Sequence, residues 1–261
     1  MNRLPALTGW NWLKEGFSLF RKQPLPLSTL FVCYMFLMIV VGLLPLVGQV
    51  LPLILLPIFS LAFLRASALV LAGERVNPKL LIAAFRSPAV KSLLLLGLLQ
   101  LVAVMTALGA SVLIDGGVFW KILSGQITVD AKVVADSNMG LAMLLSGLLY
   151  VPAAMAFWYA APLVAWHHMG VSKAVFYSFF AVLRERRAFL VYGLAWSAIG
   201  VLLPALATLI LALVFNNPSL IVAVMMPLSM LLTVVLYSSF YITYTDVFNL
   251  PAQPPTIDVA A

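Results

Sequence analysis

The chain has 261 residues, of which 64% are hydrophobic and 9% charged, and its formal net charge is +7. Ordinary soluble domains are roughly 45–50% apolar and about 25% charged, so this composition excludes a soluble globular protein. Residues 23–64 and 188–245 contain no Asp, Glu, Lys or Arg. Because about 20 apolar residues cross a bilayer once, each stretch is long enough for two membrane-spanning helices.

The first expected element is an amphipathic helix over residues 8–22. On a helical projection, its apolar residues fill one half and its polar and basic residues fill the other. This pattern is typical of a helix that lies in the membrane interface, with tryptophan among the headgroups and basic side chains against anionic lipid. The expected interfacial anchors are Trp10, Trp12, Phe17, Phe20, Lys14, Arg21 and Lys22.

Six membrane-spanning helices follow, which predicts an all-α, polytopic membrane protein. The turns after the first and fifth spans carry turn-forming residues and no charges, as expected of short connections. The expected spans are residues 27–47, 50–72, 92–114, 139–166, 188–215 and 220–245. They form a single transmembrane domain over residues 1–250, and residues 251–261 are expected to form a flexible tail.

A five-span alternative makes the region around Pro45, Pro52 and Pro57 re-entrant. It would place basic clusters on both sides of the membrane. With six spans, all lysines and arginines except Lys121 and Lys132 fall on one side. Since cytoplasmic loops carry an excess of Lys and Arg, we expect both termini in the cytoplasm and residues 115–137 on the translocated side.

The expected layout repeats three times, as an amphipathic cytoplasmic segment followed by two spans. Asn77 and Ser172 each open such a segment as an N-cap. The number of positions from Asn77 to Ser172 equals the number from Phe85 to Phe180. Three helix-plus-hairpin units related by duplication would explain this pattern. Alternating short and long loops in any polytopic protein would also produce it, and the sequence leaves both explanations open.

The chain resembles a known family at its two ends. Residues 9–24 read GWNWLKEGFSLFRKQP and residues 241–248 read YITYTDVF. Together with the six spans, these segments resemble an uncharacterised family of proteobacterial inner-membrane proteins, which is similar to the membrane domain attached to some glycerophosphodiester phosphodiesterases. The resemblance implies a polytopic fold in the bacterial inner membrane. It implies no catalytic residue, because the phosphodiesterase active site belongs to a separate soluble domain. This chain departs from the family pattern at Thr245, where the family has an arginine.

One charged residue is expected inside the membrane. Arg65 lies roughly 10 Å from the end of the second span at ~1.5 Å per residue, where a charge costs up to about 3 kcal/mol. Tyr237, Tyr241 and Tyr244 share one face of the last span, and Asp246 closes that face. We therefore predict a polar cluster of Arg65 with these four residues. The alternative is that Arg65 extends along its own stem to the interface.

The sequence carries no signature of an active site. It has no phosphate-binding loop, no zinc-protease motif, no serine-hydrolase elbow and a single cysteine, Cys33. His167 and His168 project about 100° apart on a helix, so they are poorly placed to share a metal ion. Asp115, Asp130 and Asp136 are separate loop carboxylates without an evident acid–base pair. We expect no catalytic residue, no cofactor and no metal.

Three classes of function remain. We favour a non-enzymatic membrane scaffold or modulator that acts on lipid or on partner membrane proteins. The alternatives are a small-molecule or lipid transporter, for which a cavity at mid-membrane would be evidence, and a membrane-embedded enzyme, which is the weakest. Expected partners are membrane lipids, with anionic headgroups at the basic helices, and a membrane protein or a second copy of the chain. The placement of the basic residues in loops beside spans gives no indication of nucleic-acid binding.

Overall fold

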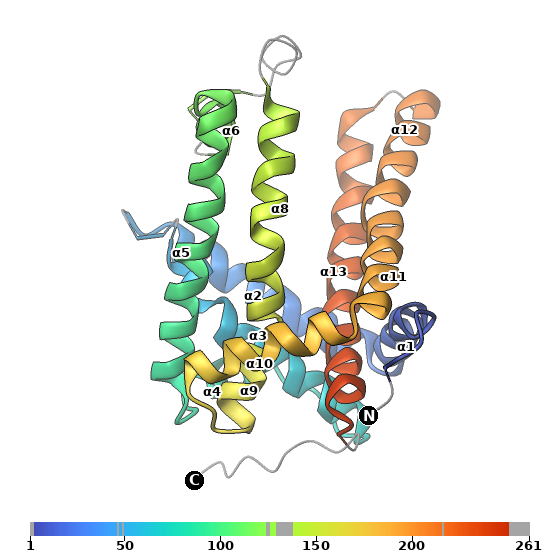
Figure 1. The fold of residues 1–261 in the computed structure, drawn as a ribbon. Helices are drawn as coiled ribbons and strands as arrows, with labels where there is room; N and C mark the ends of the chain where they lie inside the picture. The colour runs from blue at the N-terminus through green and yellow to red at the C-terminus, as the bar shows by residue number, and fades with distance from the viewer. Residues whose placement is uncertain are drawn as a thin grey trace.

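The protein is a bundle of membrane-length helices (Figure 1). The structure, a computed structural model, describes residues 3–45, 47–48, 50–123, 126–128, 138–215 and 217–250. The tail expected at 251–261 lies outside these residues. Six helical segments in the described ranges are long and apolar enough to cross a membrane, in agreement with the six expected spans. They are α2 (Pro24–Gly42), α3 (Leu51–Leu71), α5 (Val90–Asp115), α8 with α9 (Met139–Trp158 and Ala160–Trp166), α11 with η1 and α12 (Arg186–Ser197, Ala198–Leu202 and Leu203–Phe215), and α13 (Pro218–Phe248).

The central helix of the bundle is α3, which packs against α2, α5, α9 and α13. Apart from Ser60, Arg65 and Ser67 it is apolar, and residues on all its faces are buried, as expected of a helix enclosed by others. The outer helices instead expose large apolar side chains, such as Phe36 on α2 and Leu213 on α12. In a membrane these side chains face lipid rather than water.

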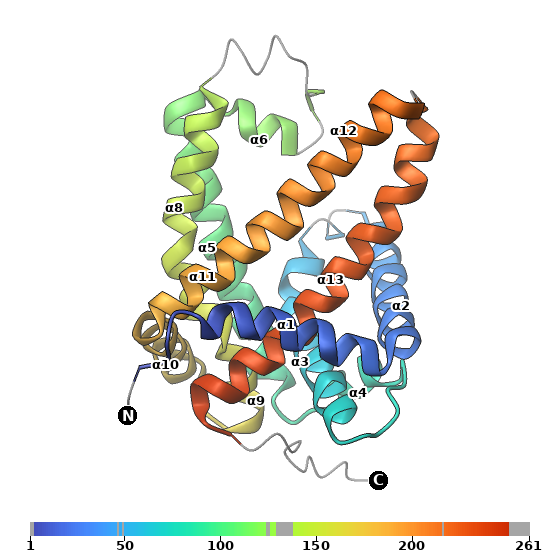
Figure 2. The same ribbon diagram turned by 90° about the vertical axis from the view of Figure 1, so that its right-hand side faces the viewer.

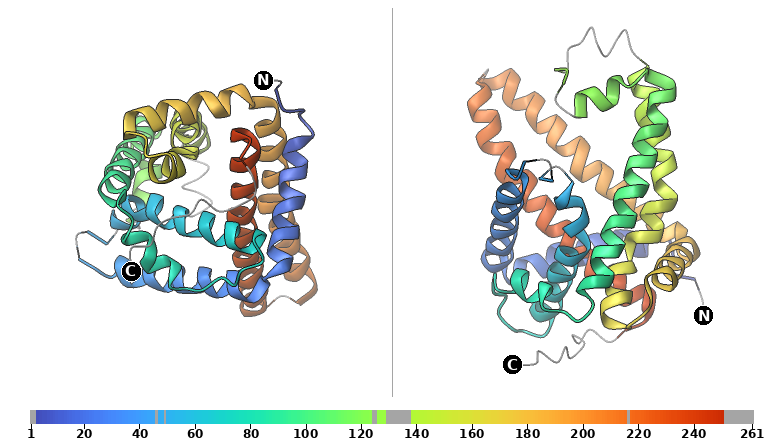
Figure 3. Two further views of the ribbon diagram at one scale, coloured as in Figure 1. Left: turned by 90° about the horizontal axis from the view of Figure 1, so that it is seen from below. Right: turned by 90° about the vertical axis from the view of Figure 1, so that its left-hand side faces the viewer.

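Two helices lie across the membrane-spanning helices rather than parallel to them. The helix α10 (Val171–Arg184) crosses beneath α8 in Figure 1, and α1 (Thr8–Lys22) crosses α13 in Figure 2. Seen from below, α10 and α1 lie along two adjoining sides of the molecule (Figure 3, left). We call this end of the bundle, which also carries the short α4 (Leu80–Phe85), the basic side. The short α6 (Val118–Leu123) lies at the opposite end.

The order of elements follows the threefold layout expected from the sequence. Helices α1, α4 and α10 each precede a pair of spans, although α4 has 6 residues where α1 has 15 and α10 has 14. The hairpins differ in length as well, since α2 has 19 residues and α13 has 31. At ~1.5 Å per residue α13 is about 46 Å long, so it exceeds a hydrocarbon core of roughly 30 Å. A common origin of the three units stays a prediction.

The fourth span is interrupted at Tyr159, between α8 and α9. In an unbroken helix the Tyr159 N–H would donate to the Met155 carbonyl. Here the Ser178 hydroxyl of α10 stands between them: its oxygen accepts the Tyr159 N–H at 2.9 Å, and it donates to the Met155 carbonyl at 2.9 Å. Ser178 is fully buried. A side chain of α10 therefore completes the backbone hydrogen bonding of the broken span and fixes α10 against it.

The fifth span is irregular for a different reason. Its middle forms a π-helical turn, η1, just before Pro204. Proline has no N–H, and its ring clashes with the carbonyl four residues earlier, which belongs to Gly200. The wider turn removes this clash without breaking the span. The fourth and fifth spans thus carry two different irregularities, and in the described part of the chain the one at Tyr159 is filled by a side chain of another helix.

The inserted hydroxyl generates a stability prediction. Ser178→Ala leaves the Tyr159 N–H and the Met155 carbonyl without their shared partner in a buried site, which costs about 1–3 kcal/mol. We expect a lower midpoint of thermal unfolding for the purified protein in detergent. Ser172→Ala, which removes an exposed hydroxyl from the same helix, should leave the midpoint unchanged. Equal midpoints for wild type and Ser178→Ala would show that the span closes its own hydrogen bond.

Candidate functional site

The N-terminal helix is held against the bundle by two glycines. A Cβ atom added to Gly9 would overlap the Ala188 carbonyl on α11, and one added to Gly16 would overlap Ser239 on α13. These glycines lie two turns apart, so they share one face of α1. That face touches the backbones of α11 and α13 directly. The apolar half of α1 is therefore packed against protein.

Trp12 lies between the two glycines and is fully buried. Its ring packs against Phe189 and Tyr192, with centroids 5.3 and 5.8 Å apart, and Trp158 packs on the same two rings from α8. Its indole N–H donates to the Asp246 carboxylate at 2.7 Å. A tryptophan that the sequence assigns to the headgroup zone thus connects α1 to the aromatic core and to the end of α13.

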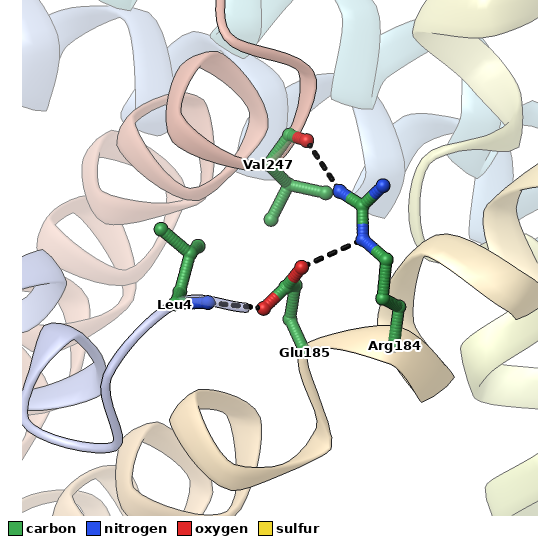
Figure 4. Close-up of polar contacts among 4 residues, drawn as sticks. All are labelled: Leu4, Arg184, Glu185 and Val247. Carbon is green, nitrogen blue, oxygen red and sulfur yellow. Dashed lines mark hydrogen bonds and ion pairs between the residues drawn. The ribbon is translucent and has the colours of Figure 1, made fainter. Parts of the chain in front are cut away.

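Glu185 joins three segments at the same end of the molecule (Figure 4). Its carboxylate is 2% exposed, accepts the backbone N–H of Leu4 at 2.7 Å and pairs with Arg184 at 2.7 Å. Arg184 also donates to the Val247 carbonyl at the end of α13, at 3.1 Å. The link between α10 and α11 therefore binds the chain before α1 and the end of α13. We call Trp12, Arg184, Glu185 and Asp246 the α13-end cluster.

Two titratable groups outside the spans are perturbed near this cluster. Burial lowers the pKa of the His167 imidazole, and the neighbouring His168 lowers it further. The neutral ring is thereby favoured, and its Nε2 lies 2.8 Å from the Tyr244 hydroxyl. Burial raises the pKa of the Glu15 carboxyl, and the Asp246 carboxylate raises it further. Both shifts follow from placing ionisable groups beside the end of α13.

The structure does not assemble the polar cluster expected around Arg65. Arg65 lies half-buried on α3, and across the described ranges no hydrogen bond or ion pair joins it to the last span. The Tyr237 ring stacks on Phe63 with centroids 4.3 Å apart. Tyr244 meets His167, and Asp246 accepts the Trp12 N–H. The three tyrosines do share one face of α13, and the buried Tyr241 packs against Trp166. The partners of this tyrosine face are aromatic rings and His167.

The predicted interfacial anchors on α1 divide into two groups. Trp12 and Phe20 are buried in the protein, and Phe17 is half-buried. Their burial follows from the packing of α1 on α11 and α13. The residues that remain exposed are Trp10, Lys14, Arg21 and Lys22, and the Lys14 ammonium lies 5.6 Å from the centre of the Trp10 ring.

A second exposed surface lies on α10. Phe176, Tyr177 and Phe180 are 59%, 49% and 49% exposed, although Ala174, Ser178 and Val182 on the other face of this helix are buried. The three aromatic residues line a groove of about 370 Å³ that reaches Arg184 and the end of α13 at Val247, Phe248 and Asn249. The Lys173 ammonium lies 5.7 Å from the centre of the Tyr177 ring. We call Lys173, Phe176, Tyr177, Phe180 and Arg184 the α10 surface.

Sequence reasoning assigned no role to Ser178 or Glu185. Their only visible signals are weak: Glu185 is the single acid in the basic run at 184–187, and Ser178 interrupts the aromatic run at 176–180. Asp115, expected in a loop, is the last residue of α5, and its carboxylate accepts the backbone N–H groups of Gly117 and Phe119 at the start of α6. Asp130 and Asp136 lie outside the described residues.

This fold defines a class: an all-α polytopic membrane protein with two helices crossing one end of its spans. The chain is 39% identical over 264 aligned positions to a probable inner membrane protein of Burkholderia thailandensis, and the alignment covers 97% of each chain. The chain belongs to the same family of inner-membrane proteins. No family model matches it, and no solved structure matches it. The further similarity to the phosphodiesterase-linked membrane domain stays a prediction.

The bond between Trp12 and Asp246 can be tested by a double-mutant cycle. Trp12→Phe removes the N–H and keeps an aromatic ring, and Asp246→Leu removes the acceptor. A hydrogen bond to a charged group contributes about 1.5–3 kcal/mol, so each variant should unfold at a lower temperature in detergent. The double variant should be little worse than Trp12→Phe, because the bond is lost only once. Additive losses would indicate that the two residues do not interact.

Proposed function

We propose that the protein is a non-enzymatic scaffold or modulator of the bacterial inner membrane, which acts on lipid and on partner membrane proteins through its basic side. The observation that carries this proposal is the α10 surface. An amphipathic helix that lies across the spans exposes aromatic rings beside two cations. A soluble protein would bury these rings, whereas a membrane interface accommodates both the rings and the cations.

Charge indicates which lipid this surface prefers. Lys173 and Arg184 lie on α10, and Arg186 and Arg187 follow at the start of α11 with exposed side chains. Glu185 offsets only Arg184, to which it is bonded, so the charges of Lys173, Arg186 and Arg187 remain at the surface. Each cation near an anionic leaflet contributes about 1 kcal/mol of attraction. Anionic phospholipid is therefore the proposed partner of the α10 surface.

Lipid preference can be measured as stabilisation, since a ligand that binds only the folded state raises the unfolding midpoint. We expect dioleoyl phosphatidylglycerol to raise the midpoint of the full chain in detergent more than dioleoyl phosphatidylcholine does. Lys173→Gln combined with Phe176→Ser should remove most of this difference. The matched control, Lys91→Gln with Phe215→Ser, changes an exposed cation and an exposed ring elsewhere. This control should retain the difference between the two lipids. An equal effect of both lipids on wild type contradicts the proposal.

We also propose that the basic side faces the cytoplasm, with both termini there. The support is the bias of lysine and arginine in the sequence. In a Cys33→Ser background, Gln126→Cys beyond α6 should react with a membrane-impermeant maleimide in intact spheroplasts. Ser172→Cys at the start of α10 should react only after permeabilisation. The reverse pattern would overturn the orientation.

Transport of a lipid or another small molecule is the second candidate. The interruption of the fourth span at Tyr159 favours it, because transporters often place binding sites at broken helices. Exchange of a fluorescent phospholipid between the leaflets of reconstituted vesicles would distinguish transport from a modulator that holds lipid in place. An enzymatic role has less support, since Asp115 is engaged in capping α6.

A further inference from the structure

A cavity of about 290 Å³ lies between the hairpins, away from the α10 surface. Its walls come from α3, α5, α8, α9, α11 and α13, and all its lining residues belong to membrane-spanning segments. Most of the wall is apolar or aromatic, including Leu96, Phe157 and Phe240. The volume corresponds to about ten water molecules, which is the low end of the size range of ligand pockets.

Two polar side chains of this cavity have no protein partner. The Gln100 amide on α5 and the Tyr150 hydroxyl on α8 form no hydrogen bond within the ranges that the structure describes. In the middle of a membrane no bulk water is present to satisfy such groups, so leaving them empty is costly. They supply N–H and O–H donors for an acceptor on the occupant, and the Gln100 carbonyl oxygen can accept from the Tyr150 hydroxyl after a small side-chain rotation.

The wall also limits the charge of the occupant. The polar residues of the wall are Ser60, Gln100, Tyr150, Trp158, Tyr192 and Tyr237. Among the described residues, no Asp, Glu, Lys, Arg or His lines the cavity. A charged group would remain unpaired there, and burying an unpaired charge is far more costly than burying a carbonyl. The occupant is therefore neutral at this point, apolar over most of its length and equipped with a hydrogen-bond acceptor.

We propose that this cavity binds one acyl chain of a glycerolipid, with the ester carbonyl of that chain held by Gln100 and Tyr150. The aromatic residues Phe157, Trp158 and Phe240 pack along the hydrocarbon. An ester carbonyl is neutral and accepts hydrogen bonds without donating any, which complements the unpartnered donors. The cavity is too small for two chains and holds the segment of one chain next to the ester, while the rest of that chain and the second chain stay outside. The site does not depend on the proposed α10 surface, because the two share no residue.

The lipid that supplies the acyl chain is either a bilayer phospholipid or a neutral glyceride. Direct binding measurements distinguish these two sources. The full-length protein is stripped of lipid in detergent and incubated with dioleoyl phosphatidylglycerol, with dioleoylglycerol or with the dialkyl ether analogue of the latter. Native mass spectrometry then gives the bound fraction. Wild type should bind an ester lipid, with dioleoylglycerol about 2- to 10-fold tighter than its ether analogue, as expected for one lost hydrogen bond. Binding of phosphatidylglycerol alone identifies the bilayer phospholipid as the source.

Variants decide whether this binding belongs to the cavity. Gln100→Met keeps the side-chain volume and should weaken ester-lipid binding by about 2- to 10-fold, and it should reduce any preference over the ether. Ala154→Trp fills the cavity and should abolish binding, whereas Val151→Trp on the exposed face of α8 should not. The inference is overturned if both α8 variants bind like wild type, or if Lys173→Gln with Phe176→Ser removes all binding while Gln100→Met removes none. Gln100→Met keeps the test valid if Ala154→Trp fails to fold.

Discussion

Backbone polar groups inside a membrane must find partners within the protein, and this requirement at Tyr159 organises much of the structure. The break in the fourth span is satisfied only because Ser178 enters it from α10. Once α10 is fixed there, Glu185 at its end is positioned to hold Leu4, and Arg184 is positioned to hold the end of α13. The Ser178 hydroxyl, together with the buried Ala174 and Val182, thus holds α10 in the position from which it gathers these chain segments.

The sequence predicted the six spans and the transverse first helix because their signals are local: apolar length, helical periodicity and uncharged turns. It assigned the apolar half of α1 to the membrane interface because periodicity shows only that a helix has an apolar face. The chain buries much of that face in protein. Gly9 and Gly16 carried the distinguishing information, since two glycines on one apolar face permit backbone contact with neighbouring helices. Their meaning becomes clear only when α11 and α13 are placed opposite them.

The candidate site was harder to predict because its pairs are distant in sequence. Matching depths suggested that Arg65 would meet the tyrosines and Asp246, but depth does not fix which faces of two helices are turned toward each other. Asp246 instead meets Trp12, 234 positions away. Ser178 and Glu185 stand in runs of aromatic and basic residues that are typical of an interfacial helix, and their buried roles arise from a break and a helix junction that composition does not reveal.

The unequal lengths of the hairpins have a consequence for the surrounding bilayer. At ~1.5 Å per residue, the 19 residues of α2 measure about 28 Å and the 31 residues of α13 about 46 Å, but Tyr241, Tyr244 and Val247 near the end of α13 are buried in protein. Tilting shortens the projection of the long helices, and α12 and α13 are visibly inclined in Figure 2. The bilayer therefore need not stretch to the full length of α13. The extra length instead carries the α13-end cluster beyond a hydrocarbon core of roughly 30 Å.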